Sequence, residues 1–235
     1  STQADVRAVN VRSKTSGSEF DVLINDRISG NQVTLENLYL PMPGTHNVQN
    51  ALAAVAVARE MGIDLTVLNR SLKNFKGVHR RFTKVGEVEK ITIIDDYAHH
   101  PVEISAVLKA ARESYNGRII AVVQPHRFTR LKYLFEEFCS CFNDADTVII
   151  SDVYPAGEAP IEGINKESLI RGLHTRGHRH VLSLDDPSKL ADLLAEFSLP
   201  GDTIVCLGAG SVTNWAQELP AKLSTVIHDS TRIKA

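Results

Sequence analysis

The first forty residues alternate apolar and polar positions in three short runs. The runs cover residues 6–12, 19–24 and 32–38. Strict alternation is typical of strands with one buried face, and the short polar turns between the runs suit antiparallel neighbours. We therefore predict a small antiparallel sheet, which ends where Pro41 and Pro43 remove backbone donors.

The period then changes to that of a helix. Residues 47–61 are rich in alanine, place apolar side chains at helical spacing and stop at Gly62, and residues 65–75 form a second, shorter helical pattern. A polar, glycine-containing link follows at residues 76–82. We place a domain boundary in this link, with one domain over residues 1–78 and a second over residues 79–235.

From residue 91 onward, short β-rich runs alternate with stretches of helical period. The β-rich runs are residues 91–94, 119–123, 148–151, 180–183 and 204–207. The helical stretches are residues 102–113, 131–142, 166–174 and 187–197. This alternation predicts an α/β fold with a mostly parallel sheet and helices on both faces. Ligands bind such sheets at the carboxyl ends of the strands, so the segments after the strands are the candidate sites.

The segment after the first of these runs is rich in titratable side chains. It reads Asp-Asp-Tyr-Ala-His-His-Pro over residues 95–101. An Asx turn and helix capping would explain any one of these residues. Their concentration at the end of a strand favours a functional site, and Pro101 suits the first turn of the next helix.

The segment after the second run, residues 124–130, carries two arginines three positions apart. If a helix begins in this segment, Arg127 and Arg130 share a face and could clamp a carboxylate or a phosphate. A solvated basic turn is the alternative. If consecutive strands pair, this segment lies beside residues 95–101 at one crevice.

Three further segments carry weaker signals. Asn47 is a natural N-cap and Asn50 follows one turn later, so capping explains one of them, whereas a pair of amides could also contact a base edge. Residues 152–163 form a long, proline-containing loop that is either a lid or a plain connector. Residues 208–211 contain only Gly-x-Gly, which favours close strand-to-helix packing over a dinucleotide fingerprint.

Composition narrows the classes of partner. Lysine and arginine number 26 against 28 acidic residues, and the net charge of −2 argues against a nucleic-acid binder. The longest apolar run, residues 51–58, is far shorter than the ~20 residues of a membrane span. Three cysteines give no even set for a disulfide framework, which fits a reducing cytoplasm. We expect no nucleic-acid or membrane partner, and the oligomeric state stays open.

Five segments together resemble the Mur ligase family of peptidoglycan synthesis. They read GTHNVQNALAA at residues 44–54, GVHRRF at 77–82, DDYAHHP at 95–101, QPHRFTR at 124–130 and DVYPAGEAPIEG at 152–163. The resemblance spans essentially the whole chain. It implies that residues 1–78 form the last part of the family's central ATPase domain and that residues 79–235 form the complete, Rossmann-like C-terminal domain, which binds the amino acid.

The resemblance is strongest to the members that join L-alanine to UDP-N-acetylmuramate in the bacterial cytoplasm. It implies an ATP- and Mg²⁺-dependent reaction, in which the carboxylate of UDP-N-acetylmuramate becomes an acyl phosphate that the amino group of L-alanine attacks. The motif Gly-x₄-Gly-Lys-Ser/Thr does not occur in these 235 residues. We therefore expect the chain to be inactive by itself.

The resemblance also implies roles for individual residues. The residues implied to line the substrate pocket are Tyr97, His99, His126, Arg127 and Arg130, with the two arginines on the alanine carboxylate. The residues implied to contact ATP are Asn47 and Asn50 at the adenine, and Arg80, Arg81 and Asp96 at the ribose or phosphates. We assign no catalytic residue and no metal ligand within this chain.

Three alternative functions stay open. The first is the sibling ligase that attaches murein tripeptide to UDP-N-acetylmuramate, although Tyr97 and the loop at residues 126–130 favour alanine. The second is a metal-dependent hydrolase that would use Asp95, Asp96, His99, His100 and His126. The third is a binding module without catalysis that would use the turn at residues 208–211.

Overall fold

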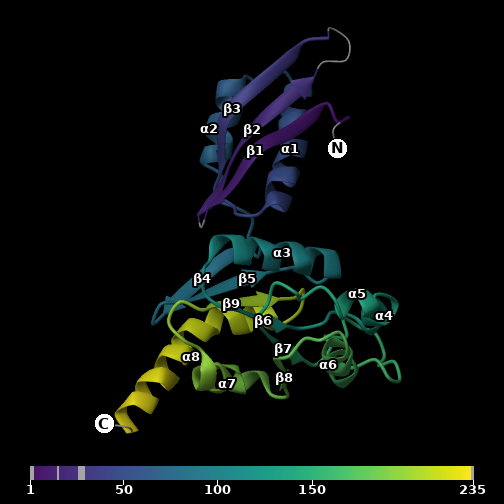
Figure 1. The fold of residues 1–235 in the computed structure, drawn as a ribbon, viewed down its shortest axis with the longest axis vertical. Helices are drawn as coiled ribbons and strands as arrows, with labels where there is room; N and C mark the ends of the chain where they lie inside the picture. The colour runs from purple at the N-terminus through teal and green to yellow at the C-terminus, as the bar shows by residue number, and fades with distance from the viewer. Residues whose placement is uncertain (1–2, 15, 26–29, 234–235) are drawn as a thin grey trace. The chain divides into compact units, whose positions relative to one another are not determined.

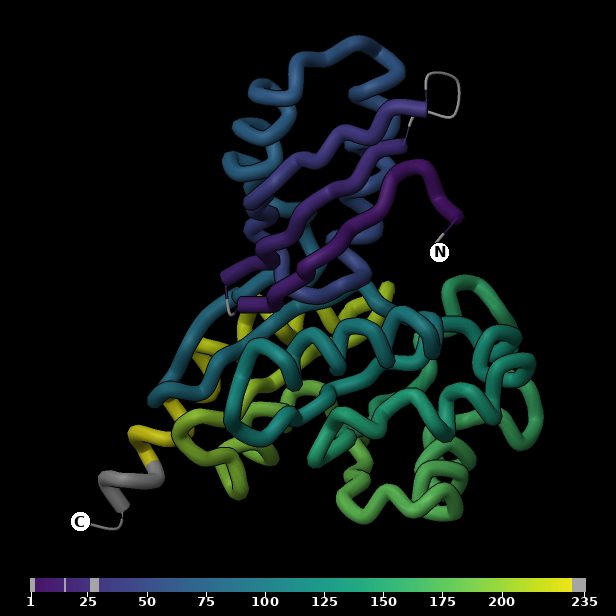
Figure 2. Tube along the Cα trace, turned by 45° about the horizontal axis from the view of Figure 1, so that its top comes forward, coloured from purple at the N-terminus to yellow at the C-terminus, as the bar shows by residue number. Residues whose placement is uncertain are grey.

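The chain folds into two compact units, which divide between Gly77 and Val78 (Figures 1 and 2). The computed structural model describes residues 3–14, 16–25 and 30–233. No helix among these residues combines the length and the apolar character that crossing a membrane would take.

The unit that ends at Gly77 is a three-stranded antiparallel sheet with two helices on one face (Figure 2). Its elements are β1 (Val6–Lys14), β2 (Gly17–Asn25), β3 (Gln32–Leu40), α1 (Thr45–Glu60) and α2 (Leu65–Lys73). Alternate residues of β2, namely Phe20, Val22 and Ile24, are buried and pack with Val48 and Val55 of α1. The predicted antiparallel sheet is confirmed, because β2 pairs antiparallel with both β1 and β3, and alternation along β2 gives that strand one buried face.

The unit that begins at Val78 contains a six-stranded sheet in the order β4-β5-β9-β6-β7-β8. Its strands are β4 (Thr83–Val88), β5 (Ile91–Asp96), β6 (Ile119–Val123), β7 (Thr147–Ser151), β8 (Val181–Leu184) and β9 (Thr203–Leu207). Every pairing is parallel except that of β4 with β5. Every residue of β5, β6, β7 and β9 is buried, which explains why these strands read as continuous apolar runs.

Helices cover both faces of this sheet, as predicted. They are α3 (Pro101–Ser114), α4 (Phe128–Tyr133), α5 (Phe135–Phe138), α6 (Lys166–Thr175), α7 (Leu190–Phe197) and α8 (Val212–Ile233), with a 3₁₀ turn, η1 (Pro187–Lys189), before α7. Successive residues of β6 face opposite cores. Ala121 and Val123 pack with α3 to α6, whereas Ile120 and Val122 pack with α7 and α8.

The structure corrects the predicted strand order. β5 and β6 are not neighbours, because β9 lies between them and pairs with both (Figure 1). The structure also adds two elements that the pattern did not predict. β4 joins β5 through a two-residue turn in which Glu89 and Lys90 take positive φ without glycine or asparagine, and α8 contains Pro220.

The single helix predicted over residues 131–142 is also wrong. The segment contains the end of α4, the four-residue α5 and a turn, because Leu134 leaves the helical conformation at φ −116° and ψ 27°. The break bends the chain while Leu131 and Phe138 both stay buried in the same core. The apolar residues keep their helical spacing on both sides of Leu134, so the sequence alone does not reveal the break.

An ion pair joins the starts of the two central strands β6 and β9. Arg118 donates from Nε and Nη2 to the two carboxylate oxygens of Asp202, at 3.0 and 2.6 Å. Asp202 also accepts a hydrogen bond from the amide of Leu199 at 2.8 Å, and its side chain is 4% exposed. Removing this carboxylate leaves the amide of Leu199 without an acceptor and leaves Arg118 with only its bond to the carbonyl of Phe197.

We therefore expect Asp202→Ala to lower the free energy of unfolding by about 2 kcal/mol, within the range for hydrogen bonds to charged groups, because Arg118 stays partly solvated. Urea unfolding followed by the fluorescence of Trp215, the only tryptophan, measures this loss. Asp202→Asn keeps an acceptor for Leu199 and is expected to lose less. Equal losses in the two variants would contradict the role given to that amide contact.

Candidate functional site

Polar loops follow β5, β6, β7 and β9 at their carboxyl ends. Hydrogen bonds continue beyond the strands, from the amide of Gly208 to the carbonyl of Asp96 at 3.2 Å and from the amide of Gln124 to the carbonyl of Leu207 at 3.0 Å. The loops after β5 and β6 are therefore separated only by the width of one strand, β9, and both are hydrogen-bonded to its end. The loops at residues 95–101 and 124–130 meet at one edge of the sheet even though their strands are not neighbours.

Four rings from three of these loops form an aromatic row. Tyr97 contacts His99 edge-on with ring centroids 5.2 Å apart, and His99 contacts His126 at 5.7 Å. Tyr154 stacks on His126 at 5.4 Å with an angle of 12° between the rings. The structure thus brings together Tyr97, His99 and His126, as predicted, and adds Tyr154. The only sequence signal for Tyr154 is its place in the loop after β7.

The first loop ends in the cap of α3. His100 is the N-cap, and its Nδ1 accepts a hydrogen bond from the amide of Val102 at 3.3 Å. Glu103 returns the contact through Oε2, which accepts from the amides of His99 and His100 at 3.2 and 3.3 Å. Pro101 occupies the first turn, as predicted. The capping interpretation therefore holds for His100, and its Nδ1 is engaged with the backbone.

The two aspartates of the first loop are the last residues of β5 and are buried. Asp96 is 1% exposed and accepts hydrogen bonds from the amides of Phe82 and Ala98, both at 2.7 Å. Burial raises the pKa of Asp96 to about 6, against the lowering effect of the two amides. The oxygens of Asp95 are enclosed as well, and Thr213 donates its hydroxyl to one of them.

Arg80 lies near the start of the unit that begins at Val78 and contacts the same edge of the sheet. Its Nη2 donates to the carbonyl of Gly208 at 2.7 Å, and its Nε lies 3.9 Å from a carboxylate oxygen of Asp95. The guanidinium also covers the ring of Tyr97 at 4.6 Å from the centroid. Arg81 is exposed, with its guanidinium 6.0 Å from the same ring. Of the two predicted nucleotide-binding arginines, Arg81 is the more accessible.

The second loop places its arginines differently from the prediction. α4 begins at Phe128, and Arg127 is its N-cap with φ 73°, so Arg127 and Arg130 do not share a helical face. Arg130 folds back, and its Nη1 lies 2.9 Å from the carbonyl oxygen of His126 and 3.1 Å from His126 Nδ1. Arg127 is exposed, with Nη1 3.9 Å from a carboxylate oxygen of Glu158.

The third loop, residues 152–163, is fixed against the second. The amide of Tyr154 donates to the carbonyl of Pro125 at 2.7 Å, and the amide of Arg127 donates to the carbonyl of Tyr154 at 2.8 Å. Glu158 accepts from the hydroxyl and the amide of Thr129, at 2.6 and 3.0 Å. These bonds lower the pKa of Glu158. The third loop is thus fixed beside the second, where it holds Tyr154 next to His126 and Glu158 near Arg127.

Because Glu158 supplies the acceptor for the Thr129 amide, Glu158→Ala is expected to speed hydrogen exchange of that amide about tenfold, the effect of losing one ordinary hydrogen bond to a charged group. Amide exchange followed by NMR measures this. Glu162→Ala, at an exposed position of the same loop, is the matched control and should leave the exchange rate unchanged. A similar rate in all three proteins would show that Glu158 does not hold α4.

The turn after β9 is closely packed. A Cβ atom on Gly210 would lie 2.5 Å from Gln124 Oε1 and 2.6 Å from the ring of Tyr154. Gln124 fixes the turn through Oε1, which accepts from the amide of Val212 at 3.1 Å, and through Nε2, which donates to Ser211 Oγ at 3.0 Å. The packing interpretation of these glycines is therefore confirmed.

The predicted adenine contacts lie in the other unit. Gly44, with φ 97°, is the N-cap of α1, so the prediction that Asn47 caps this helix is wrong. Asn47 lies in the first turn, is 5% exposed and donates from Nδ2 to the carbonyl of Pro43 at 2.8 Å. Asn50 is exposed. The amide of Asn50 is consequently the more accessible of the two.

Metal ligands do not gather at this edge. Across the residues that the structure describes, no three or more His, Cys, Asp and Glu side chains converge as ligands of a metal ion would. His100 caps a helix and Asp96 accepts two backbone amides, so the residues of the hydrolase alternative are directed to different partners.

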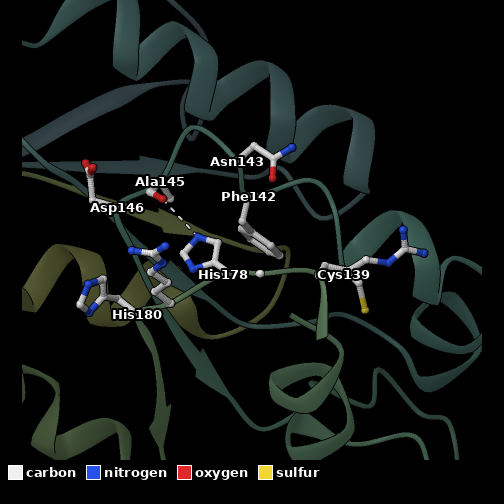
Figure 3. A pocket seen from close by; sticks show the side chains of 10 residues that line it. Cys139, Phe142, Asn143, Ala145, Asp146, His178 and His180 are labelled. Carbon is white, nitrogen blue, oxygen red and sulfur yellow. Dashed lines mark hydrogen bonds between the residues drawn. The ribbon is translucent and has the colours of Figure 1, made fainter. Parts of the chain in front are cut away.

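A separate hollow of about 260 Å³ lies where β7 and β8 begin, at the opposite edge of the sheet (Figure 3). Its lining includes Arg176, which pairs with Glu136, and His178, whose Nε2 lies 3.2 Å from the carbonyl oxygen of Ala145. None of the residues predicted to bind substrate or ATP lines it. The positive side chains here follow the carboxyl end of α6, where cations complement the helix dipole.

Comparison with known proteins identifies relatives over almost the whole chain. Residues 80–210 match the family model described as Mur ligase, glutamate ligase domain. A UDP-N-acetylmuramate--L-alanine ligase of Rhodospirillum centenum is 57% identical over 95% of this chain and 46% of its own length. One of Acidiphilium cryptum is 54% identical over 99% and 48%. The chain thus spans about half the length of these curated relatives.

Solved structures agree with the fold. The crystal structure of the UDP-N-acetylmuramate-alanine ligase MurC of Thermotoga maritima matches with a TM-score of 0.77 and 25% identity, over 96% of this chain and 47% of that one. A murein peptide ligase of Psychrobacter arcticus matches with a TM-score of 0.64 and 23% identity, over 95% and 45%. The second match shows the fold alone.

Proposed function

The chain belongs to the Mur ligase family, and from this membership we propose that it is the amino-acid-binding part of an ATP-dependent ligase that joins L-alanine to UDP-N-acetylmuramate. The observation that carries the proposal is the meeting of the aromatic row with Arg127 and Arg130 at the carboxyl edge of the sheet. Relatives that are 54–57% identical carry the corresponding name, which supports the choice of alanine.

In this proposal the two units have different tasks. Residues 1–78 are the last part of the central, ATP-binding domain, and residues 79–235 are the domain that binds the amino acid. The division of the chain between Gly77 and Val78 is compatible with this assignment, as is its span of about half of each relative. The bacterial cytoplasm supplies ATP, so we place the reaction there.

The amino acid would bind through its carboxylate. Arg127 and Arg130 provide guanidinium groups, which match a carboxylate in charge and geometry. Tyr97, His99 and His126 would then enclose the small side chain of alanine. The positive charge of Arg127 is only partly offset, because Glu158 lies at the long distance of 3.9 Å and is also hydrogen-bonded to Thr129.

Binding the carboxylate leaves the amino group of alanine available for chemistry. An acyl phosphate already reacts with a free amine, so the main tasks of the protein are to orient the two reactants and to neutralise negative charge. The arginines serve both tasks. The new amide bond forms as the carbon–oxygen bond to phosphate breaks, and inorganic phosphate leaves with the proton that the amine loses.

The remaining predicted residues concern ATP. We propose Asn47 and Asn50 at the adenine, and Arg80, Arg81 and Asp96 at the ribose or phosphates. Asn50 and Arg81 are the exposed members of this set. The sequence has no phosphate-binding loop, and the described residues offer no cluster for a metal ion. We propose that Mg²⁺ and the further contacts to the phosphates are supplied by the rest of the complete protein, since the chain spans about half the length of its relatives.

Phosphate release in the presence of ATP, UDP-N-acetylmuramate and L-alanine tests this proposal. The complete protein should release phosphate only when all three are present, and this chain alone should release none. Turnover by the chain alone would refute the division of labour. In a competition assay, a preference of the complete protein for murein tripeptide over L-alanine would favour the sibling ligase instead.

A further inference from the structure

His126 lies at the centre of the aromatic row and faces an arginine through one ring nitrogen. Its Nδ1 is 3.1 Å from Nη1 of Arg130. A guanidinium has N–H donors and no acceptor, and it stays charged at every pH at which proteins are folded. Nδ1 must therefore accept this hydrogen bond with its lone pair. A neutral imidazole that accepts at Nδ1 carries its proton on Nε2.

Three other contacts fix the orientation of the ring. The same Nη1 of Arg130 donates to the carbonyl of His126 at 2.9 Å, so one nitrogen joins the backbone and the ring of the residue. Tyr154 stacks on one face at an angle of 12°, and His99 contacts the ring edge-on. A 180° flip of the imidazole would put Cδ2 in the place of Nδ1 and break the bond to Arg130.

The other ring nitrogen is available to a ligand. Nε2 of His126 has no hydrogen-bond partner among the described residues. It is not completely buried either, so it reaches solvent. The side chain itself is half-buried. An N–H group held in a fixed direction beside two guanidinium groups is suited to an anionic oxygen.

We propose that Arg130 is a positioning residue that holds His126 as the neutral tautomer protonated on Nε2, and that this N–H donates a hydrogen bond to an anionic oxygen of the bound reactants. Carboxylate and phosphate oxygens share this chemistry. Only the identity of that oxygen rests on the proposed function, because the tautomer follows from contacts within this chain. His126 is then a hydrogen-bond donor rather than a base that deprotonates the amine.

The surrounding charges favour the same state. Burial lowers the pKa of His126, as do the positive charges of Arg130 and Arg127 and the neighbouring imidazole of His99, and the carboxylate of Glu158 opposes them only in part. The two tyrosines of the row contribute ring faces rather than charge. A second proton on the imidazole would sit on Nδ1, opposite the N–H of Arg130, and would break that hydrogen bond.

Nitrogen-15 NMR of histidine side chains in this chain tests the tautomer directly. The His126 signals are assigned by their loss in His126→Gln. At neutral pH we expect Nδ1 in the range of an unprotonated nitrogen and Nε2 in the range of a protonated one. A proton on Nδ1, an even mixture of tautomers or a doubly protonated ring at pH 7 overturns the proposal, and the wild-type spectrum alone decides this.

Two arginine variants separate the hydrogen bond from the charge. Arg130→Met removes both and is expected to give a mixture of tautomers and a higher pKa of His126. Arg127→Gln removes an equal charge that makes no bond to the ring, so the pKa should rise while the proton stays on Nε2. A change of tautomer in Arg127→Gln, or none in Arg130→Met, contradicts the positioning role.

Activity of the complete protein tests the donor. The amide nitrogen of glutamine occupies roughly the place of Nε2, whereas that of asparagine occupies the place of Nδ1. His126→Gln should therefore retain most of the kcat/KM for ligation, and His126→Asn should lose about 10- to 100-fold, as expected for one hydrogen bond to a charged group. Equal losses would refute the Nε2 donor. Failure to ligate alanine at all, with the NMR result intact, would instead refute the proposed function.

Discussion

In the complete protein, Arg130→Ala is expected to raise the KM for L-alanine by an amount that corresponds to about 2–5 kcal/mol of lost binding. Arg130 is half-buried, so its contact with a carboxylate would be poorly screened by water. The variant also frees the ring of His126, which loses its partner at Nδ1. Both effects weaken the binding of L-alanine, whereas the KM for ATP should change little.

Steady-state kinetics with each substrate varied in turn measures this change. Arg171→Ala is the matched control, because Arg171 is exposed on α6, outside the loops that form the candidate site. Its KM for L-alanine should stay within about twofold of the wild-type value, as for a surface substitution. An unchanged KM in Arg130→Ala would remove this residue from amino-acid binding and leave Arg127 as the carboxylate ligand to test.

The sequence was sufficient to predict the fold class and the edge of the sheet at which the polar loops lie. It was not sufficient to predict the strand order. The residues of β9 are all fully buried, as are most of those of β5 and β6, so each of these strands is equally suited to the centre of the sheet. The pairing of β9 with both neighbours depends on how the helices wind across the two faces, which periodicity does not record.

The sequence predicted some residues of the site but not their long-range contacts, their burial or the start of the helix that carries them. Three rings of the aromatic row came from two motifs, but Tyr154 joins them through a parallel bridge to His126, a long-range contact without a local signal. The paired aspartates resembled an exposed polar loop, whereas both end a buried strand. The helical spacing of Arg127 and Arg130 was misleading, because one residue with positive φ moved the start of α4.

The burial of Asp96 leads to a dependence of stability on pH that is opposite to that of an ordinary exposed aspartate. Its pKa is about 6 in the folded chain and 3.8 for the unperturbed group. Below about pH 4 the carboxyl is protonated in both states and has no effect. Between about pH 4 and 6 the unfolded chain ionises first, so folding loses stability as the pH rises. Above pH 6 the loss levels off at ~3 kcal/mol.

We therefore expect the free energy of unfolding of the wild type, measured relative to Asp96→Asn, to fall by about 2 kcal/mol between pH 4.5 and 7.5. The reference variant has no charge at this position, and its lost amide contact is independent of pH, so it cancels in the slope. Urea unfolding followed by Trp215, which lies in the same unit, supplies the values. Asp186→Asn is the opposite control, because hydrogen bonds from Ser188 lower the pKa of the exposed Asp186 and reverse the sign of its slope. If the free energy of unfolding of the wild type relative to Asp96→Asn does not change with pH, water reaches this carboxylate in the folded chain. Asp96 could then contact a ribose or a phosphate without a rearrangement of the surrounding residues.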